Sequence, residues 1–208
     1  MNIFIKMNKT KIQLSAKEMR LVTNADIILT KNAIIKKTIT LLEKVQHEQQ
    51  DYLSKASQLL PQEVLDYSPK ISKGENYKGL PYLVLDHPRI FDKPNVFAIR
   101  TMFWWGNFFS VTLHLSGRYK LLFEKNIINS YEALKDSGFA VCVNKEEWEH
   151  HFEENNYRTL SQIKQTEFKK SILEAVFVKL AKKISLQDWD KVPDILIADF
   201  RKIIEMIT

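Results

Sequence analysis

The sequence predicts an α+β fold: a central antiparallel sheet of about four or five strands, packed by a long N-terminal helix and by C-terminal helices. Three observations lead to this prediction. Apolar residues recur at helical spacing through residues 26–60 and again through residues 167–207. Between them, residues 95–124 are rich in β-branched and aromatic side chains, which favour strands. This order of helices, strands and helices is that of an α+β protein, and the length of 208 residues suits a single domain over residues 1–208.

The N-terminal part of the chain is predicted to be a loose arm over residues 1–14, followed by helical structure over residues 15–60. Ser15, followed three residues later by Glu18, has the pattern of a capping box. Asn24 can cap a second, longer helix. The apolar stripe of that helix must be buried on the sheet, against the C-terminal helices or in a homodimer, and its spacing does not choose between them.

The middle of the chain is predicted to contain a connection at 61–79, rich in proline and glycine, and then mainly sheet over 80–143. The expected strands are 82–85, 96–105, 108–116, 118–124 and the short apolar stretch 139–143. Residues 144–208 are expected to be helical. The expected helices after the main strands are 127–136, 145–154, 167–184 and a final helix that begins near Pro193.

A two-residue turn at Gly106-Asn107 sets the predicted register of the central hairpin, because glycine suits such a connection. This turn places Trp105 opposite Phe108 and puts a set of polar side chains on one sheet face, ringed by aromatic residues. The candidate ligand-binding residues of this face are Thr101, Trp105, Ser110, Thr112 and His114. The alternative is that they are ordinary mid-strand residues covered by a helix.

Arg100 is predicted to lie on the opposite face, among Met102, Leu113 and Leu115. A buried guanidinium must pair with a carboxylate or with several carbonyls, because an unpaired buried charge is costly. Arg100 is therefore a structural ion-pair partner, an anion-binding residue, or a side chain that reaches solvent at the sheet edge.

The segment Asp86-His87-Pro88-Arg89 follows an expected strand and carries the most suggestive group of polar residues. Pro88 disfavours helix at His87, so a turn is expected there. In a catalytic interpretation His87 is the acid or base, Asp86 orients it, and Arg89 or Arg100 binds an anionic substrate. In the alternative, Asp86 binds the backbone amides of a tight turn and His87 faces water.

The sequence predicts no metal and no cofactor. Glu147 and His150 form one E-x-x-H pair on an expected helix, but helical metal sites use two such pairs, so a solvated charged face is favoured. The chain has five glycines and lacks a phosphate-binding loop, a dinucleotide fingerprint and a set of zinc-binding cysteines. Its single cysteine, Cys142, allows no internal disulfide, which fits the cytoplasm.

The formal net charge of +6 lies mainly in the first half of the chain. It is weak support for nucleic acid as a partner, because the charges are spread along helix faces and the aromatic residues have no base-stacking motif around them. No apolar run is long enough to cross a membrane, so no membrane partner is expected. The N-terminus lacks a signal-peptide pattern, and either Met1 or Met7 can be the start.

Together these features favour a cytoplasmic binding or interaction protein without catalysis. It would use the polar sheet face for a small anionic ligand, or the long helix for a second copy in a homodimer. The first alternative is a hydrolase or transferase that acts on an anionic substrate through His87, Asp86 and an arginine. A further alternative is nucleic-acid binding through the basic N-terminal half.

Overall fold

The computed structural model describes residues 12–56 and 58–208. The chain divides into two compact units, which we name the N-terminal unit (Met1–Thr38) and the sheet unit (Ile39–Thr208). Most of the predicted loose arm at 1–14 lies outside the described residues, and the single-domain assignment stays a prediction.

The described part of the N-terminal unit contains two helices that begin at the predicted start signals. They are α1 (Ala16–Val22) and the beginning of α2 (Ala25–Lys55). The capping box is confirmed, because the Glu18 amide donates to Ser15 Oγ at 3.2 Å and the Ser15 amide donates to Glu18 Oε2 at 2.7 Å. The side chain of Asn24 accepts a hydrogen bond from the Asp26 amide at 3.0 Å, as expected of a cap.

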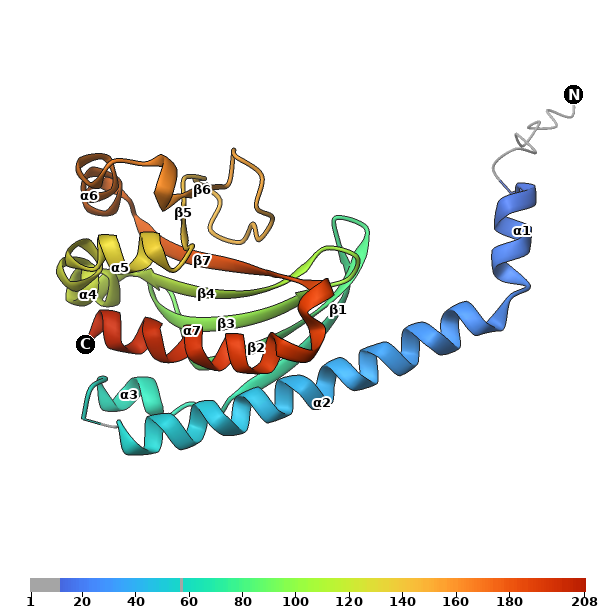
Figure 1. The fold of residues 1–208 in the computed structure, drawn as a ribbon, viewed down its shortest axis with the longest axis horizontal. Helices are drawn as coiled ribbons and strands as arrows, with labels where there is room; N and C mark the ends of the chain where they lie inside the picture. The colour runs from blue at the N-terminus through green and yellow to red at the C-terminus, as the bar shows by residue number, and fades with distance from the viewer. Residues whose placement is uncertain (1–11, 57) are drawn as a thin grey trace, which may run out of the picture. The chain divides into compact units, whose positions relative to one another are not determined.

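The sheet unit is built on one seven-stranded antiparallel sheet with the order β1-β2-β3-β4-β7-β5-β6 (Figure 1). The strands are β1 (Lys70–Tyr77), β2 (Leu80–Asp92), β3 (Asn95–Trp104), β4 (Phe108–Ser116), β5 (Ala140–Cys142), β6 (Tyr157–Thr159) and β7 (Phe177–Ser185). The predicted α+β class is confirmed, whereas the sheet has seven strands instead of four or five.

The remaining helices connect and cover these strands. They are α3 (Gln62–Leu65), α4 (Gly117–Asn129), α5 (Tyr131–Asp136), α6 (Gln165–Glu174) and α7 (Val192–Ile207), with short 3-10 turns at Leu160–Gln162 and Leu186–Lys191. Pro193 stands in the first turn of α7, as predicted. Within the described residues, no helix has the length and apolar character needed to cross a membrane.

The predicted strand at 118–124 is wrong, because these residues belong to α4. Tyr119 and Phe123 lie one helical turn apart, and both rings pack on Phe97 of β3, at 5.7 and 5.8 Å between centroids. Their alternation with Leu121 also fits a strand, but Leu121 is 68% exposed. The helical period therefore describes the burial of this segment, and the two-residue period does not.

Two predicted helices are also wrong in whole or in part. Residues 145–154 form an irregular segment between β5 and β6, and the helix predicted over 167–184 ends at Glu174, before β7. Lys182 and its neighbours in β7 pair with β4 along their whole length, so long-range pairing overrides the local helical pattern.

The connection predicted over 61–79 contains α3 and the edge strand β1, whose polar residues suit an exposed edge. The turn predicted at 86–89 is likewise wrong, because β2 continues through it. The pairing of β2 with β3 shifts register between Asp86 and Arg89, around the cis peptide bond of His87 and Pro88. Proline lacks an amide proton and is tolerated in a strand at such an irregularity.

The central hairpin turns through three residues, 105–107, instead of two, with Gly106 at a positive φ of 71°. Trp104 therefore pairs with Phe108, and every predicted pair moves by one residue. A shift of one residue carries a side chain to the other face of the sheet. Thr101 consequently lies on the face opposite Thr112, and Arg100 pairs directly with Thr112.

The sheet has two faces of different character. The first, which we name the apolar face, carries Leu85, Ile99, Thr101, Phe103, Phe109, Val111, Leu113 and Leu180. Helices α4 and α7 pack on it. The second, which we name the polar face, carries Asp86, Arg100, Ser110, Thr112, His114 and Lys179. The irregular residues 143–156, named the cap segment, cover it.

Candidate functional site

A bidentate ion pair lies on the polar face, where β2 and β3 are neighbours. Asp86 and Arg100 stand directly opposite each other in the register. Arg100 donates from Nε to Asp86 Oδ1 at 2.7 Å and from Nη2 to Asp86 Oδ2 at 2.9 Å. This fork geometry gives the strongest form of a charged hydrogen bond between side chains. Arg100 therefore has the carboxylate partner that its sequence context requires.

The cap segment is attached to the polar face through its backbone. The ammonium of Lys179, on β7, donates to the carbonyl oxygens of Glu147 at 2.8 Å and of Glu149 at 2.6 Å. The hydroxyl of Tyr77, on β1, accepts from the amides of His150 at 2.7 Å and His151 at 3.0 Å. The same hydroxyl donates to the Glu149 carboxylate at 2.8 Å. These bonds satisfy the backbone of a segment that forms no helix or strand.

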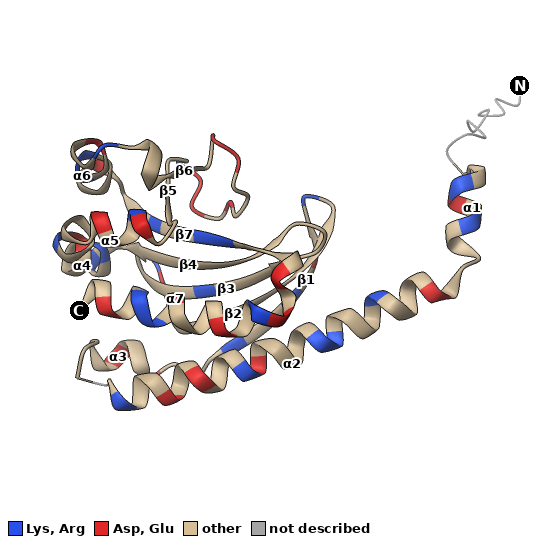
Figure 2. Ribbon diagram, in the orientation of Figure 1, with Lys and Arg blue, Asp and Glu red and all other residues tan. Residues whose placement is uncertain are grey.

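The charges of the cap segment complement those beneath it. Figure 2 shows acidic residues along the segment between β5 and β6, and five of its fourteen residues are glutamates. Burial lowers the pKa of Lys179 to about 8, with Arg100 adding a repulsive contribution, while nearby Glu149 and Glu147 act in the opposite direction. Lys179 is consequently still mostly protonated near neutral pH, as its two carbonyl partners require.

Two histidines of this region are held neutral. Burial lowers the pKa of His114 to about 3, with smaller contributions from the positive charges of Lys179 and Arg100. Burial also holds the pKa of His150 well below its ordinary value. Neutral His150 Nε2 lies 3.1 Å from Arg100 Nη1 and accepts a hydrogen bond from it. His114 Nε2 lies 3.4 Å from a Glu147 carboxylate oxygen but makes no hydrogen bond with it.

A cavity of about 460 Å³ opens beside the Asp86–Arg100 pair, and we name it the Arg100 cavity. Its walls are formed by Lys70, Ser72, Lys73, Tyr77, Tyr82, Val84, Asp86, Arg89, Phe91, Arg100, Trp148 and His150. The lining holds four cationic side chains and one carboxylate. Its aromatic part includes Phe91 and Trp148, whose ring centroids are 6.0 Å apart. The Arg100 guanidinium lies 5.7 Å from the Phe91 ring centroid.

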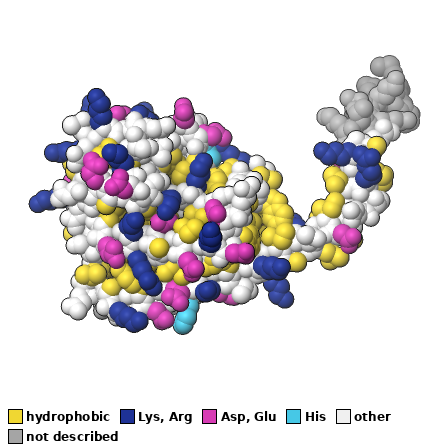
Figure 3. Space-filling model, viewed as in Figure 1, with side chains coloured by type: hydrophobic (Ala, Val, Ile, Leu, Met, Phe, Trp, Pro, Cys, Tyr) yellow, Lys and Arg dark blue, Asp and Glu magenta, His cyan; other side chains and the backbone are white. Residues whose placement is uncertain are grey.

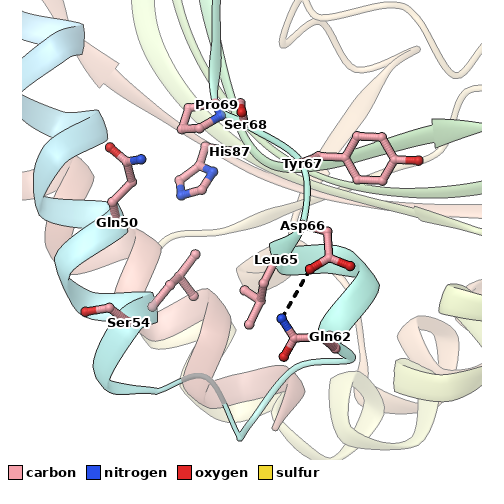
Figure 4. A pocket seen from close by; sticks show the side chains of 10 residues that line it. Gln50, Ser54, Gln62, Leu65, Asp66, Tyr67, Ser68, Pro69 and His87 are labelled. Atoms are coloured by element: carbon pink, nitrogen blue, oxygen red, sulfur yellow. Dashed lines mark hydrogen bonds between the residues drawn. The ribbon is translucent and has the colours of Figure 1, made fainter.

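His87 lines a different cavity, of about 480 Å³, which we name the His87 cavity (Figure 4). Its walls come from α2, α3 and the segment that leads into β1. The dashed line in Figure 4 joins Gln62 to Asp66, at 3.2 Å. The His87 ring is buried, and neither of its nitrogens has a hydrogen-bond partner among the described residues. Burial lowers the pKa of His87 to about 4, with a smaller contribution from Arg89.

The structure brings together only part of the candidate set. Asp86, Arg89 and Arg100 line the Arg100 cavity, and Arg89 Nε donates to the Ser68 carbonyl at 2.9 Å. Asp86 was predicted to orient His87, but the two residues line different cavities. The Asp86 carboxylate pairs with Arg100 instead of with the imidazole of His87.

The other candidates fall into two groups. Ser110, Thr112 and His114 are buried on the polar face and do not line the Arg100 cavity, whereas Thr101 belongs to the apolar face. Trp105 lies in the hairpin turn, with its ring 6.2 Å from that of Phe103.

Sequence reasoning misses several residues of this site. Tyr77 and Lys70 stand in a stretch that resembles a connection, and their strand is recognised only through its pairing with β2. Trp148 stands in a predicted helix that does not form. Lys179 offers the one usable signal, since a lysine inside the apolar run of residues 176–181 must find polar partners.

Comparison with protein-family models, with curated proteins and with solved structures finds no match for this chain. In the part of the chain that the structure describes, no three His, Cys, Asp or Glu side chains are grouped as a metal site would require. The geometry and charge of the Arg100 cavity are therefore the best indication of function.

Proposed function

We propose that this protein binds a small anionic ligand in the Arg100 cavity and does so without catalysis. The observation that carries the proposal is the excess of cationic side chains in the lining. Four of them, Lys70, Lys73, Arg89 and Arg100, stand against the single carboxylate of Asp86. A concave site lined by one sign of charge attracts ligands of the opposite sign.

The donors that can meet an anion are supplied by the arginines and by Lys70. A guanidinium has five N–H groups. Arg100 uses three of them, on Asp86 and His150, and two remain. Arg89 uses its Nε on the Ser68 carbonyl, so its two terminal nitrogens are left for a ligand. Lys73 contributes less, because its ammonium pairs with Glu75 at 2.7 Å.

The aromatic part of the lining favours a ligand with a ring or another flat apolar group. Tyr77, Tyr82, Phe91 and Trp148 supply ring surface within the same cavity. Flat aromatic surfaces bind rings through stacking and edge contacts, which add to the attraction of the charges. The proposed ligand class is therefore a small aryl or heterocyclic phosphate or carboxylate.

Two observations favour binding over catalysis. The lone pair of His150 is engaged by Arg100, so this histidine is not a ready general base. His87 lines the other cavity, away from Asp86. Cys142 is also a poor nucleophile, because burial raises the pKa of its thiol.

The use of a single, unpaired cysteine in the described residues favours a reducing compartment such as the cytoplasm.

Isothermal titration calorimetry with inorganic phosphate, phenyl phosphate and phenol tests this proposal. We expect phenyl phosphate to bind most tightly, because it alone uses both the charged and the aromatic parts of the lining. The double variant Lys70→Gln/Arg89→Gln should bind it at least tenfold more weakly, since charged hydrogen bonds contribute on that scale. Arg100 is left unchanged because its loss would leave Asp86 unpaired.

The matched control is Lys169→Gln/Lys170→Gln, which removes two exposed charges from α6. It should leave the affinity for phenyl phosphate unchanged. Absence of binding by either anion, or equal weakening in the control, would contradict the proposal. Release of inorganic phosphate from phenyl phosphate by the unmodified protein would favour the hydrolase alternative instead.

A further inference from the structure

The formal charge of the chain is concentrated in the N-terminal unit. Met1–Thr38 carries eight Lys or Arg residues against two Asp or Glu, which accounts for the whole net charge of +6. In the sheet unit, Ile39–Thr208, 23 basic residues balance 23 acidic ones. A short segment with this charge attracts anionic partners strongly, while the sheet unit has no net attraction.

The same unit exposes apolar side chains at high density. Every residue from 12 to 30 is exposed, and α1 contains no buried residue. The large apolar side chains exposed in this stretch are Ile12, Leu14, Met19, Leu21, Val22, Ile27, Ile28 and Leu29. Figure 3 shows hydrophobic and basic side chains together on α1 and on the start of α2. A contiguous apolar surface of this kind marks an interaction site.

The exposed apolar surface around the start of α2 is too wide to be covered by a single partner helix. Ile27, Ile28 and Leu29 are consecutive and are 43%, 57% and 63% exposed. Consecutive residues are about 100° apart around a helix, so these three cover roughly 200° of its circumference. A partner helix covers a narrower stripe. The interface of a lipid bilayer can cover a wider apolar stripe of a helix than a partner helix can. The long basic side chains of the same helix then extend toward the lipid headgroups.

The positive charge of the N-terminal unit distinguishes between the possible binding partners of this surface. A second copy would bring two N-terminal units of +6 together, which is unfavourable. Nucleic acid would attract the charge but would give the exposed aliphatic side chains no apolar surface to contact. An anionic bilayer offers both an apolar boundary and negative headgroups.

We infer that the N-terminal unit is a docking surface for an anionic phospholipid bilayer, with α1 and the first turns of α2 lying in the interface. This departs from the sequence-based expectation of no membrane partner, which considered only a segment that crosses the bilayer. An interfacial helix needs no spanning segment, since its apolar side chains enter only the headgroup boundary. The inference is independent of the ligand proposed for the Arg100 cavity, because it involves no residue of that cavity.

The test is co-sedimentation of the full chain with large vesicles of phosphatidylcholine alone and of phosphatidylcholine mixed with phosphatidylserine. We expect binding to the mixed vesicles, weakening as salt is added, and little binding to phosphatidylcholine alone.

Each basic residue near an anionic surface strengthens binding about fivefold. The variant Lys17→Gln/Arg20→Gln should therefore bind roughly 25-fold more weakly. Ile27→Ser/Ile28→Ser should bind the mixed vesicles at least tenfold more weakly, because two apolar side chains that would enter the bilayer interface are removed.

Two matched controls lie in the sheet unit. Lys169→Gln/Lys170→Gln removes the same charge from α6, and Leu121→Ser/Leu122→Ser removes two leucines of α4 that are 68% and 57% exposed. Both should bind the mixed vesicles as the unmodified protein does. All four variants change exposed residues, and circular dichroism melting will show that each remains folded.

Three outcomes would overturn the inference. The first is absence of co-sedimentation with the mixed vesicles, or equal weakening in the control variants. The second is a dimer in sedimentation velocity that Ile27→Ser/Ile28→Ser abolishes without vesicles, which assigns the surface to a second copy. The third is salt-sensitive binding to DNA or RNA that the serine variant retains while vesicle binding is absent, which assigns it to nucleic acid.

Discussion

The two faces of the sheet are covered in different ways. On the apolar face, buried side chains such as Phe109 and Leu113 pack against helices α4 and α7, and their association is non-directional. On the polar face, Lys179 and Tyr77 bind backbone groups of the cap segment through hydrogen bonds of defined geometry. The covering of the first face is regular structure, and that of the second is an irregular segment.

This difference shows why the candidate site lies on the polar face. A helix satisfies its own backbone and needs from the sheet only an apolar surface. The cap segment cannot satisfy its own backbone, so the sheet below it must supply polar side chains. Those side chains leave charged groups such as Arg100 and Arg89 beside a cavity, where a ligand can use the donors that remain.

Truncation of a side chain should destabilise the protein most on the apolar face of the sheet. Phe109→Ala removes a fully buried ring that packs on Phe103 and Trp189, at 5.1 and 5.4 Å between centroids. We expect the free energy of unfolding to fall by about 4 kcal/mol, because a large cavity is left in a packed core. Urea denaturation measures it. Phe91→Ala, at a ring that is 38% exposed, is the control and should cost under half as much.

The ion pair of the polar face should show the cost of an unpaired charge. Asp86→Ala leaves the Arg100 guanidinium without its carboxylate and should lower the free energy of unfolding by about 3 kcal/mol. The double variant Asp86→Ala/Arg100→Met should recover much of this loss, since the stranded charge is gone. A double variant as unstable as Asp86→Ala would show that packing around Asp86, and not its charge, is responsible.

The attachment of the cap segment can be weakened locally. Tyr77→Phe removes the hydroxyl that accepts from the amides of His150 and His151. We expect a loss of about 2 kcal/mol, because two partly buried amides lose their acceptor. Hydrogen exchange should accelerate at these two amides and stay unchanged in α7. Tyr67→Phe, at an exposed ring, is the control, and faster exchange throughout the sheet unit would contradict a local attachment.

The buried histidines predict a loss of stability in acid. The folded-state pKa is about 4 for His87 and about 3 for His114, both below the ordinary 6.5. The unfolded chain therefore takes up protons first as the pH falls below 6.5. Stability should fall by about 1.4 kcal/mol per pH unit for each histidine, down to its folded-state pKa. Urea denaturation between pH 7 and about 4 measures this slope.

The variant His87→Leu isolates one of these contributions, because it removes the titrating group from the His87 cavity and leaves the polar face intact. Its stability should depend less steeply on pH between 6.5 and about 4 than that of the unmodified protein. An unchanged slope would show that His87 does not titrate as its burial implies.

Part of the candidate site follows from the sequence. A lone arginine in an apolar strand needs a carboxylate, and Asp86 supplies it from the neighbouring strand. The prediction that Thr101 and Thr112 share one face is wrong because the hairpin turn has three residues instead of two. The extra turn residue places the two side chains on opposite faces of the sheet. Asp86 and His87 are neighbours in the chain but line different cavities, which a sequence pattern does not reveal.

The features that the sequence predicts correctly are those that local interactions stabilise. The capping box at Ser15, the aromatic and β-branched strands of the central hairpin and the proline at the start of α7 all depend on neighbours within a few residues. The α+β class follows from the order of these elements.

Other features depend on residues that are distant in the chain, and local sequence patterns do not predict them. The segment Phe177–Ser185 has apolar residues at spacings that suit a helix or a strand, and pairing with β4 and β5 selects the strand. Residues 145–154 favour a helix locally, yet Lys179 and Tyr77 bind their backbone and keep them irregular. Such partners lie tens of residues away in the chain, and their contribution to the free energy exists only once the sheet has formed.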